Sequence, residues 1–251
     1  MTTAPLLYVC VRPQQGAAAA EYESFRSAAR LDASQLVQHD LVRDALPPDV
    51  FERYSGFFVG GSPFNLTDPE SSKTDVQRRL ESDLERIAAG IIDPPSGAPG
   101  RAGLFTCYGI GVVTRMLGGV VSRAYPEDTG PVLVELTQDG KSDPLLGTLA
   151  RSFTALTAHK EGTASVPDGA TLLATNAGCP VQAYRVGDRL YATQFHPEPT
   201  TRAFTERMAV YRDDGYFPAN DYETVAGRVL AASVTEPVRL LRAFARAFGP
   251  G

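Results

Sequence analysis

The stretch from Ala102 to Gly111 places the strongest constraint on what this chain can fold into. An apolar run typical of a buried strand ends at Cys107, Gly109 follows two residues later, and apolar residues then continue to Leu117. Strand, cysteine and helix in this order are the layout of a nucleophile elbow, a sharp turn that lifts one side chain out of a sheet. The N–H groups at the start of the helix would favour negative charge beside the thiol.

A second segment, Gln194 to Glu198, reads Gln-Phe-His-Pro-Glu and follows another apolar strand. Residues two apart in an extended segment point to the same side, so His196 and Glu198 can complete a catalytic triad with Cys107. Each feature alone has a simpler interpretation, because free cysteine is usually a buried apolar residue and His-x-Glu is a weak signal. The combination of a cysteine at a strand–helix junction with a histidine and an acid after a second strand favours catalysis.

At these residues the sequence resembles the class I glutamine amidotransferases, whose signature pairs a Gly-x-Cys-x-Gly-x-Gln elbow with a Gln-Phe-His-Pro-Glu segment. The second half is matched in full, and Cys107 and Gly109 match the first half. Phe105 stands where the family usually has Gly, and Gly111 stands where it usually has Gln. We expect Phe105 to crowd the elbow, and we expect the small Gly111 to leave more space in the glutamine pocket.

The resemblance covers residues 6 to 200 and implies roles for several further residues. Gly60 and Gly61 follow an apolar strand, where the common reason for glycine is a positive φ. By resemblance, the N–H of Gly61 forms an oxyanion hole with the N–H of Tyr108. The same resemblance places Gly60, Gly111 and His159 at the substrate pocket, although His159 is also typical of a hydrogen-bonded structural histidine.

Alternating strands and helices predict an α/β fold, a mostly parallel open sheet with helices on both faces, layered as in flavodoxin-like proteins. The chain of 251 residues is long enough for one well-buried domain, which we assign to 1–251 with a core over 6–200 and a helical extension over 201–251. The expected strands are 6–11, 36–42, 55–59, 102–106, 120–125, 131–136, 153–158, 171–175, 181–185 and 189–194. The expected helices are 17–29, 73–89, 112–117, 201–211, 222–232 and 237–248, with a helical turn at 143–147 and a loop at 93–100.

Composition excludes several classes of function. The net charge of −5 and the absence of a basic block make nucleic acid an improbable partner. No apolar run approaches the roughly 20 residues of a membrane span, and the start Met1–Pro5 does not read as a signal peptide. The three cysteines have no metal spacing and predict no disulfide framework, so we expect a reducing, cytoplasmic setting with no metal and no cofactor.

Three functional hypotheses remain open. In the first, the Cys107 thiolate attacks the side-chain amide of glutamine, and the ammonia passes to a synthetase subunit, as in stand-alone units similar to the glutaminase part of GMP synthase. In the second, the same triad hydrolyses a larger γ-glutamyl compound. In the third, the chain is a non-catalytic binding or regulatory subunit. The segment 199–251 carries no ATP motif and is too short for a synthetase domain, and its helices are expected to pack on the sheet or to form a homodimer surface.

Overall fold

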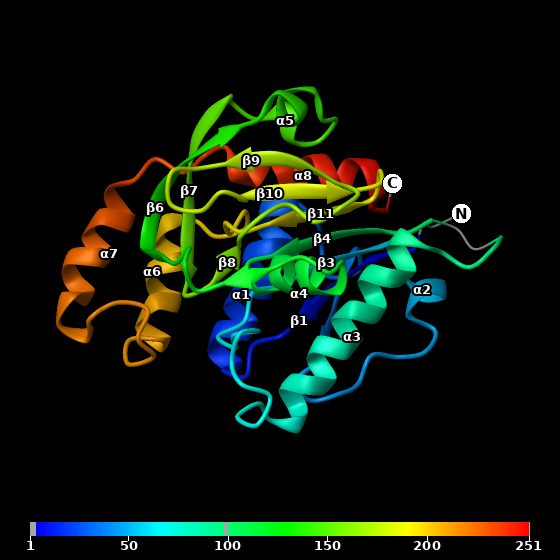
Figure 1. Ribbon diagram of the computed structural model, residues 1–251, viewed down its shortest axis with the longest axis horizontal. Helices are drawn as coiled ribbons and strands as arrows, with labels where there is room; N and C mark the ends of the chain where they lie inside the picture. Colours follow the sequence, from blue (N-terminus) through cyan, green and yellow to red (C-terminus); the bar gives the residue numbers. More distant parts are fainter. Residues whose placement is uncertain (1–3, 98–99, 251) are drawn as a thin grey trace.

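The computed structural model describes residues 4–97 and 100–250 and contains a nine-stranded sheet with helices on both faces (Figure 1). The strand order is β2-β1-β3-β4-β11-β10-β9-β6-β7. Strands β2 to β11 in this order pair in parallel, and the remaining strands extend the sheet by antiparallel pairing. The predicted α/β class with a mostly parallel core sheet is therefore confirmed.

The elements follow the predicted order along the chain. The strands are β1 (Leu6–Cys10), β2 (Leu36–Asp40), β3 (Gly56–Val59), β4 (Ala102–Thr106), β5 (Val121–Ser122), β6 (Glu127–Leu136), β7 (Ser152–His159), β8 (Gly162–Thr163), β9 (Ala170–Thr175), β10 (Ala183–Val186) and β11 (Leu190–Thr193). The α-helices are α1 (Gln15–Ala29), α2 (Val50–Arg53), α3 (Asp75–Ile92), α4 (Tyr108–Met116), α5 (Gln138–Ser142), α6 (Thr201–Val210), α7 (Tyr222–Ala231) and α8 (Pro237–Phe248).

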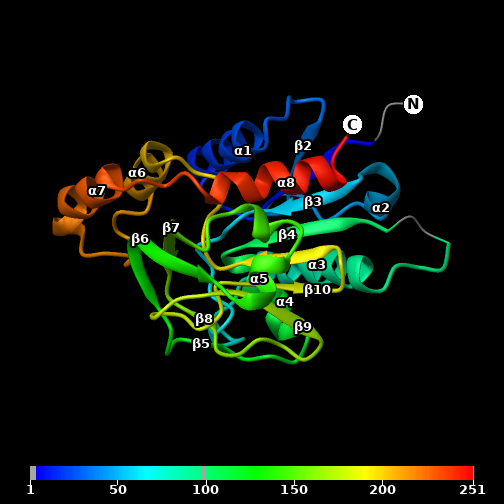
Figure 2. The ribbon, with the colours of Figure 1, turned by 90° about the horizontal axis from the view of Figure 1, so that it is seen from above.

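Two layers of helices bury the two faces of the sheet, as the view from above shows (Figure 2). Helices α1 and α8 cover one face, where Phe25, Phe58 and Phe244 belong to one apolar cluster. Helices α3 and α4 cover the other face, where Leu84 and Val113 pack in a second cluster. Because helices cover both faces of the sheet, every residue of β1, β3 and β4 is buried, and these parallel strands are almost continuously apolar.

The C-terminal helices have two different neighbours. Helix α8 packs along α1, whereas α6 and α7 pack together beside β6 and β7 at the antiparallel end (Figure 1). The prediction that the helical extension packs on the rest of the fold agrees with these contacts. None of the helices in the described ranges is long and apolar enough to cross a membrane.

The differences from the predicted elements are local. The predicted strand 120–125 is reduced to β5, because this segment pairs only with the two-residue β8 outside the main sheet. The short helices α2 and α5 were not predicted, because they are too short to show a repeating apolar pattern. The predicted helical turn at 143–147 contains only the start of a 3₁₀ helix, Leu146–Thr148. Two parts of the predicted segments lie outside the described residues: residues 1–3 of the segment assessed as a signal peptide, and residues 98–99 of the predicted loop.

Candidate active site

Cys107 occupies a strained turn between β4 and α4. Its backbone dihedrals are φ 52° and ψ −102°, a region that side-chain-bearing residues rarely adopt and that is found at functional sites. The Cys107 N–H donates to the carbonyl of Thr193 at 2.8 Å, which ties the turn to the end of β11. The residue forms the N-cap of α4, so its thiol lies at the positive end of that helix.

The predicted crowding by Phe105 does not occur. Phe105 is fully buried in the apolar cluster under α4. A Cβ on Gly103 would lie 2.9 Å from the Phe105 ring, and a Cβ on Gly109 would lie 3.0 Å from the Cβ of Phe105. The ring therefore occupies space that both neighbouring glycines leave free, and the elbow accepts Phe105 two residues before Cys107.

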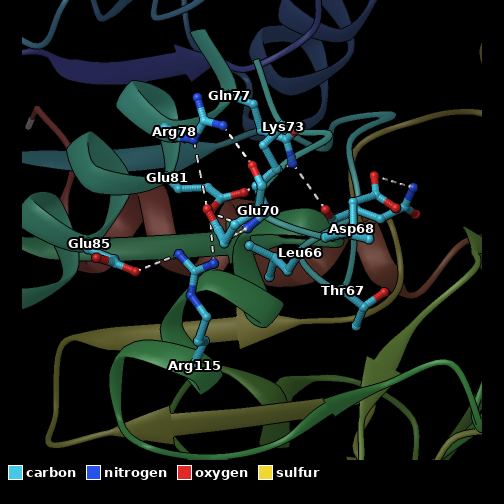
Figure 3. A network of polar contacts seen from close by, with 12 residues as sticks. Leu66, Thr67, Asp68, Glu70, Lys73, Gln77, Arg78, Glu81, Glu85 and Arg115 are labelled. Carbon is cyan, nitrogen blue, oxygen red and sulfur yellow. Dashed lines mark hydrogen bonds and ion pairs between the residues drawn. The ribbon is translucent and has the colours of Figure 1, made fainter. Parts of the chain in front are cut away.

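A buried polar network holds α4 against α3 (Figure 3). The carboxylate of Glu81 accepts hydrogen bonds from Tyr108 Oη at 3.0 Å, Arg115 Nη1 at 2.7 Å and Lys73 Nζ at 3.0 Å. Burial raises the pKa of Glu81, but the hydrogen bonds from Arg115, Lys73 and Gln77 outweigh it and leave the pKa below its usual value. The network fixes the first turn of α4 and therefore the backbone of Tyr108. Tyr108 is the first residue of the helix, so its N–H has no acceptor within the helix.

His196 and Glu198 lie together as the spacing predicts. His196 Nδ1 donates to Glu198 Oε1 at 2.9 Å, and both side chains are almost completely buried. The His196 N–H also donates to the carbonyl of Leu156, which anchors the segment to β7. The structure thus brings Cys107, His196 and Glu198 to one edge of the sheet, because β4 and β11 are neighbouring parallel strands that end there.

Three further charged residues form a network with Glu198, and none of them was predicted from the sequence. Arg207 on α6 donates from Nη1 to Glu198 Oε1 at 2.8 Å and to Glu21 Oε1 at 2.9 Å. Arg12, just after β1, donates to the same Glu21 oxygen at 2.8 Å. All three side chains are at least 93% buried, with exposures of 6%, 7% and 0% for Arg12, Arg207 and Glu21. Two carboxylates therefore share two guanidinium groups behind the imidazole.

These charges shift the titration of the pair. Burial lowers the pKa of His196, but the neighbouring Glu198 carboxylate outweighs this effect, and the pKa is raised to about 9. Arg207 lowers it, and both the charge of Cys107 and a hydrogen bond to Cys107 raise it. Burial raises the pKa of Glu198, yet the imidazolium and the Arg207 guanidinium hold it well below its usual value.

The two glycines after β3 meet different surroundings, and neither has a positive φ. A Cβ on Gly61 would lie 2.8 Å from His196 Cε1 and 3.4 Å from the Cβ of Cys107, so close approach to both side chains requires glycine there. The Gly61 N–H donates a long hydrogen bond of 3.4 Å to Glu21 Oε1, an acceptor that the prediction of an oxyanion-hole donor did not anticipate. Gly60 faces Glu21 and Tyr8 and lies outside both cavities described next.

Cys107 borders two adjoining cavities. The first has the more polar lining of the two and is lined by residues that include Asn65, Gly111, Lys160, Glu161 and Gln194. The second is lined by His196 and by side chains of the segment 204–217, together with Arg12 and Arg207. The expected extra space at Gly111 is absent, because Leu66 Cδ1 lies 2.6 Å from where a Cβ on Gly111 would stand.

His159 lines the first cavity and is also fixed by hydrogen bonds, as a structural histidine would be, and its role in substrate binding stays a prediction. Its Nε2 lies 2.8 Å from Glu127 Oε2, and its Nδ1 lies 2.9 Å from the carbonyl of Glu161. The Glu161 carboxylate in turn accepts the N–H groups of Leu66 and Thr67. The His159–Glu127 pair therefore holds the wall of the cavity, and it lies apart from the pair formed by His196 and Glu198.

The only group of three residues in the described ranges with spacing suited to a metal ion is Glu21, His196 and Glu198, whose ligand atoms lie within 4.8 Å of one another. Guanidinium nitrogens of Arg12 and Arg207 already contact Oε1 of the two carboxylates. A bound cation would lie beside these two positive charges. The donor set therefore fits an ion-pair network better than a metal centre.

Comparison with known proteins places this geometry in a family. The family described as "Glutamine amidotransferase class-I" matches residues 104–210, a range that contains Cys107, His196 and Glu198. The resemblance to the class I glutamine amidotransferases is therefore confirmed by a family match over residues 104–210. Among solved structures, a glutamine amidotransferase from Thermotoga maritima shares the fold with a TM-score of 0.71, at 18% identity over 98% of this chain and 97% of that one.

Relatives of this chain differ in what they are described to do. Gamma-glutamyl peptidase 3 of Arabidopsis thaliana is 28% identical over 64% of this chain. The GMP synthase [glutamine-hydrolyzing] of Thermobifida fusca is 36% identical over 37% of this chain. The matched region covers 63% of the length of the peptidase and 17% of the length of the synthase.

Proposed function

We propose that this chain hydrolyses the side-chain amide of glutamine to glutamate and ammonia through a thioester on Cys107. The single observation that carries the proposal is the strained Cys107 at the start of α4, next to the hydrogen-bonded pair of His196 and Glu198. A thiol with a nearby imidazole that is oriented by a carboxylate is the arrangement required for nucleophilic acyl transfer.

In this mechanism Cys107 Sγ attacks the side-chain carbonyl carbon and the C–N bond breaks. The proton on His196 goes to the departing nitrogen, which leaves as ammonia. Water then attacks the thioester, the imidazole accepts its proton, and glutamate and the thiol are regenerated. The negative oxygen of each tetrahedral intermediate would accept from the Tyr108 N–H and from Gly61, whose long bond to Glu21 would give way.

The electrostatics support the change of role that His196 undergoes. In the free enzyme, the charge of Cys107 and its hydrogen bond contribute to the raised pKa of His196, so the imidazole holds a proton for the leaving group. Formation of the thioester removes both contributions. The pKa of His196 then falls, which lets the imidazole accept a proton from the attacking water.

The second candidate function is hydrolysis of a γ-glutamyl amide, in which an amine replaces ammonia as the leaving group. It is supported by the second cavity at Cys107 and by the similarity to the Arabidopsis thaliana gamma-glutamyl peptidase. For the first function, similarity to the GMP synthases supports a separate synthetase as the acceptor of ammonia.

The test is product release by the purified chain from glutamine and from a γ-glutamyl dipeptide, with Cys107→Ala as the matched control. We expect turnover of at least one substrate and its complete loss in Cys107→Ala. Alkylation of Cys107 by iodoacetamide at neutral pH is measured in parallel, because a catalytic thiol reacts fast. Turnover that survives in Cys107→Ala would reject the Cys107 mechanism. An inert thiol without turnover would also reject it and would favour the non-catalytic hypothesis.

A further inference from the structure

The two cavities at Cys107 differ in chemical character. The first has the more polar lining of the two, and the proposed function assigns it to the glutamyl group. The second has an apolar and aromatic wall formed by Phe204, Met208, Tyr211, Tyr216 and Phe217. The space between these side chains is about 410 Å³ when the open space at the mouth is included.

The position of His196 determines on which side of Cys107 the leaving group lies. Among the described residues, His196 lines the second cavity and is not part of the lining of the first. A general acid must lie within hydrogen-bond reach of the atom that it protonates. The nitrogen that departs from the thioester must therefore lie toward the second cavity, while the acyl group points into the first.

The wall of the second cavity is more apolar than ammonia requires. The rings come from α6 and from the segment 211–217, which lies just beyond the residues matched by the family. Phe204 and Met208 belong to an apolar cluster that Phe217 completes. Contact with such rings stabilises an aromatic group, because it buries apolar area and allows ring–ring packing.

Two guanidinium groups in the same wall have nitrogens without an acceptor. Within residues 4–97 and 100–250, Arg12 Nε and Arg207 Nη2 are buried and have no hydrogen-bond partner. Both side chains are more than nine-tenths buried, and both residues line the second cavity. An unpaired buried N–H is unfavourable, and a carboxylate is the acceptor that guanidinium groups bind most strongly.

We propose that the second cavity binds the leaving group of a γ-glutamyl amide, and that this group is an aromatic α-amino acid with its carboxylate toward Arg12 and Arg207. The inference rests on the proposed function, because the same bonds form and break. Cys107 Sγ bonds to the γ-carbonyl carbon, the C–N bond breaks, and the amino-acid nitrogen takes the proton from His196. Water then cleaves the thioester, and the products are glutamate and the free aromatic amino acid.

The first experiment compares kcat/KM for four substrates: γ-glutamyl-phenylalanine, γ-glutamyl-phenethylamine, γ-glutamyl-glycine and glutamine. We expect γ-glutamyl-phenylalanine to exceed γ-glutamyl-glycine by about tenfold or more, as burial of a ring predicts. We also expect it to exceed γ-glutamyl-phenethylamine, which lacks the carboxylate, by about tenfold. Phe217→Ala and Met208→Ala should each reduce the first ratio severalfold. Leu230→Ala, an exposed position on α7, is the control and should not change it.

A second measurement does not depend on turnover or on a single variant. Free L-phenylalanine should slow the alkylation of Cys107 by iodoacetamide, glycine should not, and Phe217→Ala should abolish the protection.

Two outcomes overturn the inference and can be told apart. Hydrolysis of glutamine through Cys107, with no preference among the γ-glutamyl amides and no protection by phenylalanine, rejects the leaving-group site and leaves the proposed function standing. Absence of any Cys107-dependent turnover rejects both.

Discussion

Removal of the Arg207 guanidinium tests whether a residue of the C-terminal segment supports the triad. In Arg207→Met the long apolar stem is kept, but the hydrogen bonds from Nη1 to Glu198 and to Glu21 are lost. Glu198 Oε2 already lacks a partner within the described residues, so its carboxylate would retain only the bond from His196. Glu21 would retain Arg12 as its one guanidinium partner.

The magnitude follows from the number of charged contacts that are lost. A hydrogen bond to a charged group contributes about 1.5–3 kcal/mol, and removal of one partner of a buried ion pair costs about 3–5 kcal/mol. We therefore expect Arg207→Met to lower the free energy of unfolding by about 3–5 kcal/mol. Because Arg207 lowers the pKa of His196, the variant should also raise that pKa further, and the pH profile of turnover should move to higher pH.

The assay is urea unfolding at pH 7 for the wild type, Arg207→Met and the control Arg202→Met. Arg202 lies on the same helix and forms an ion pair with Glu206 that is largely exposed, with side-chain exposures of 86% and 64%. An exposed pair contributes at most about 1 kcal/mol, so the control should be nearly neutral. If Arg207→Met is no less stable than Arg202→Met and the pH profile is unchanged, Arg207 does not support Glu198 and the reasoning is refuted.

Two further predictions concern Gly61 and the His196–Glu198 pair. Gly61→Ala should lower kcat/KM roughly a hundredfold, because the new methyl group would displace the imidazole of His196. The control Gly16→Ala, whose new Cβ meets no neighbouring atom of the described residues within 4 Å, should raise the free energy of unfolding by about 0.5–1 kcal/mol. Enzyme kinetics and urea unfolding measure the two effects, and equal activity of the two variants would contradict the prediction for Gly61. NMR titration should give His196 a pKa of about 9, and a lower value in Glu198→Gln. The pKa of His196 is raised in the folded state, so the stabilisation that Glu198 gives through the imidazolium is complete below pH 6.5 and is lost as pH rises through about 9. The difference in the free energy of unfolding between wild type and Glu198→Gln should therefore shrink over that window.

The parts of the site that lie on parallel strand ends could be predicted from the sequence. Cys107, His196 and the glycines after β3 each follow an apolar strand directly, and β3, β4 and β11 are neighbours in the sheet. Residues at the carboxyl ends of neighbouring parallel strands meet at one edge, so short local patterns were sufficient to group them. The order of helices and strands was predictable for the same reason, since it depends on local periodicity.

The effects of single departures from the family pattern were predicted wrongly, because they depend on neighbours in space. Phe105 was expected to crowd the elbow, and Gly111 was expected to open the pocket. The first fits because Gly103 and Gly109 provide room for the ring, and the second opens nothing because Leu66 fills the space. The size of one residue indicates a clash or a gap only when the residues packed against it are known.

The network behind the triad shows why a local pattern could not reveal the whole site. Glu21 and Arg207 are 186 positions apart, and each looks like an ordinary charged residue on an amphipathic helix. Two buried carboxylates this close together would repel each other, so Glu198 could not stay ionised beside Glu21 without cationic partners. Arg12 and Arg207 supply that charge, and Arg207 contacts both carboxylates. Helix α6 therefore does more than cover the sheet: it brings in a positive charge that keeps Glu198 ionised, and the ionised Glu198 orients His196 and raises the pKa of its imidazole.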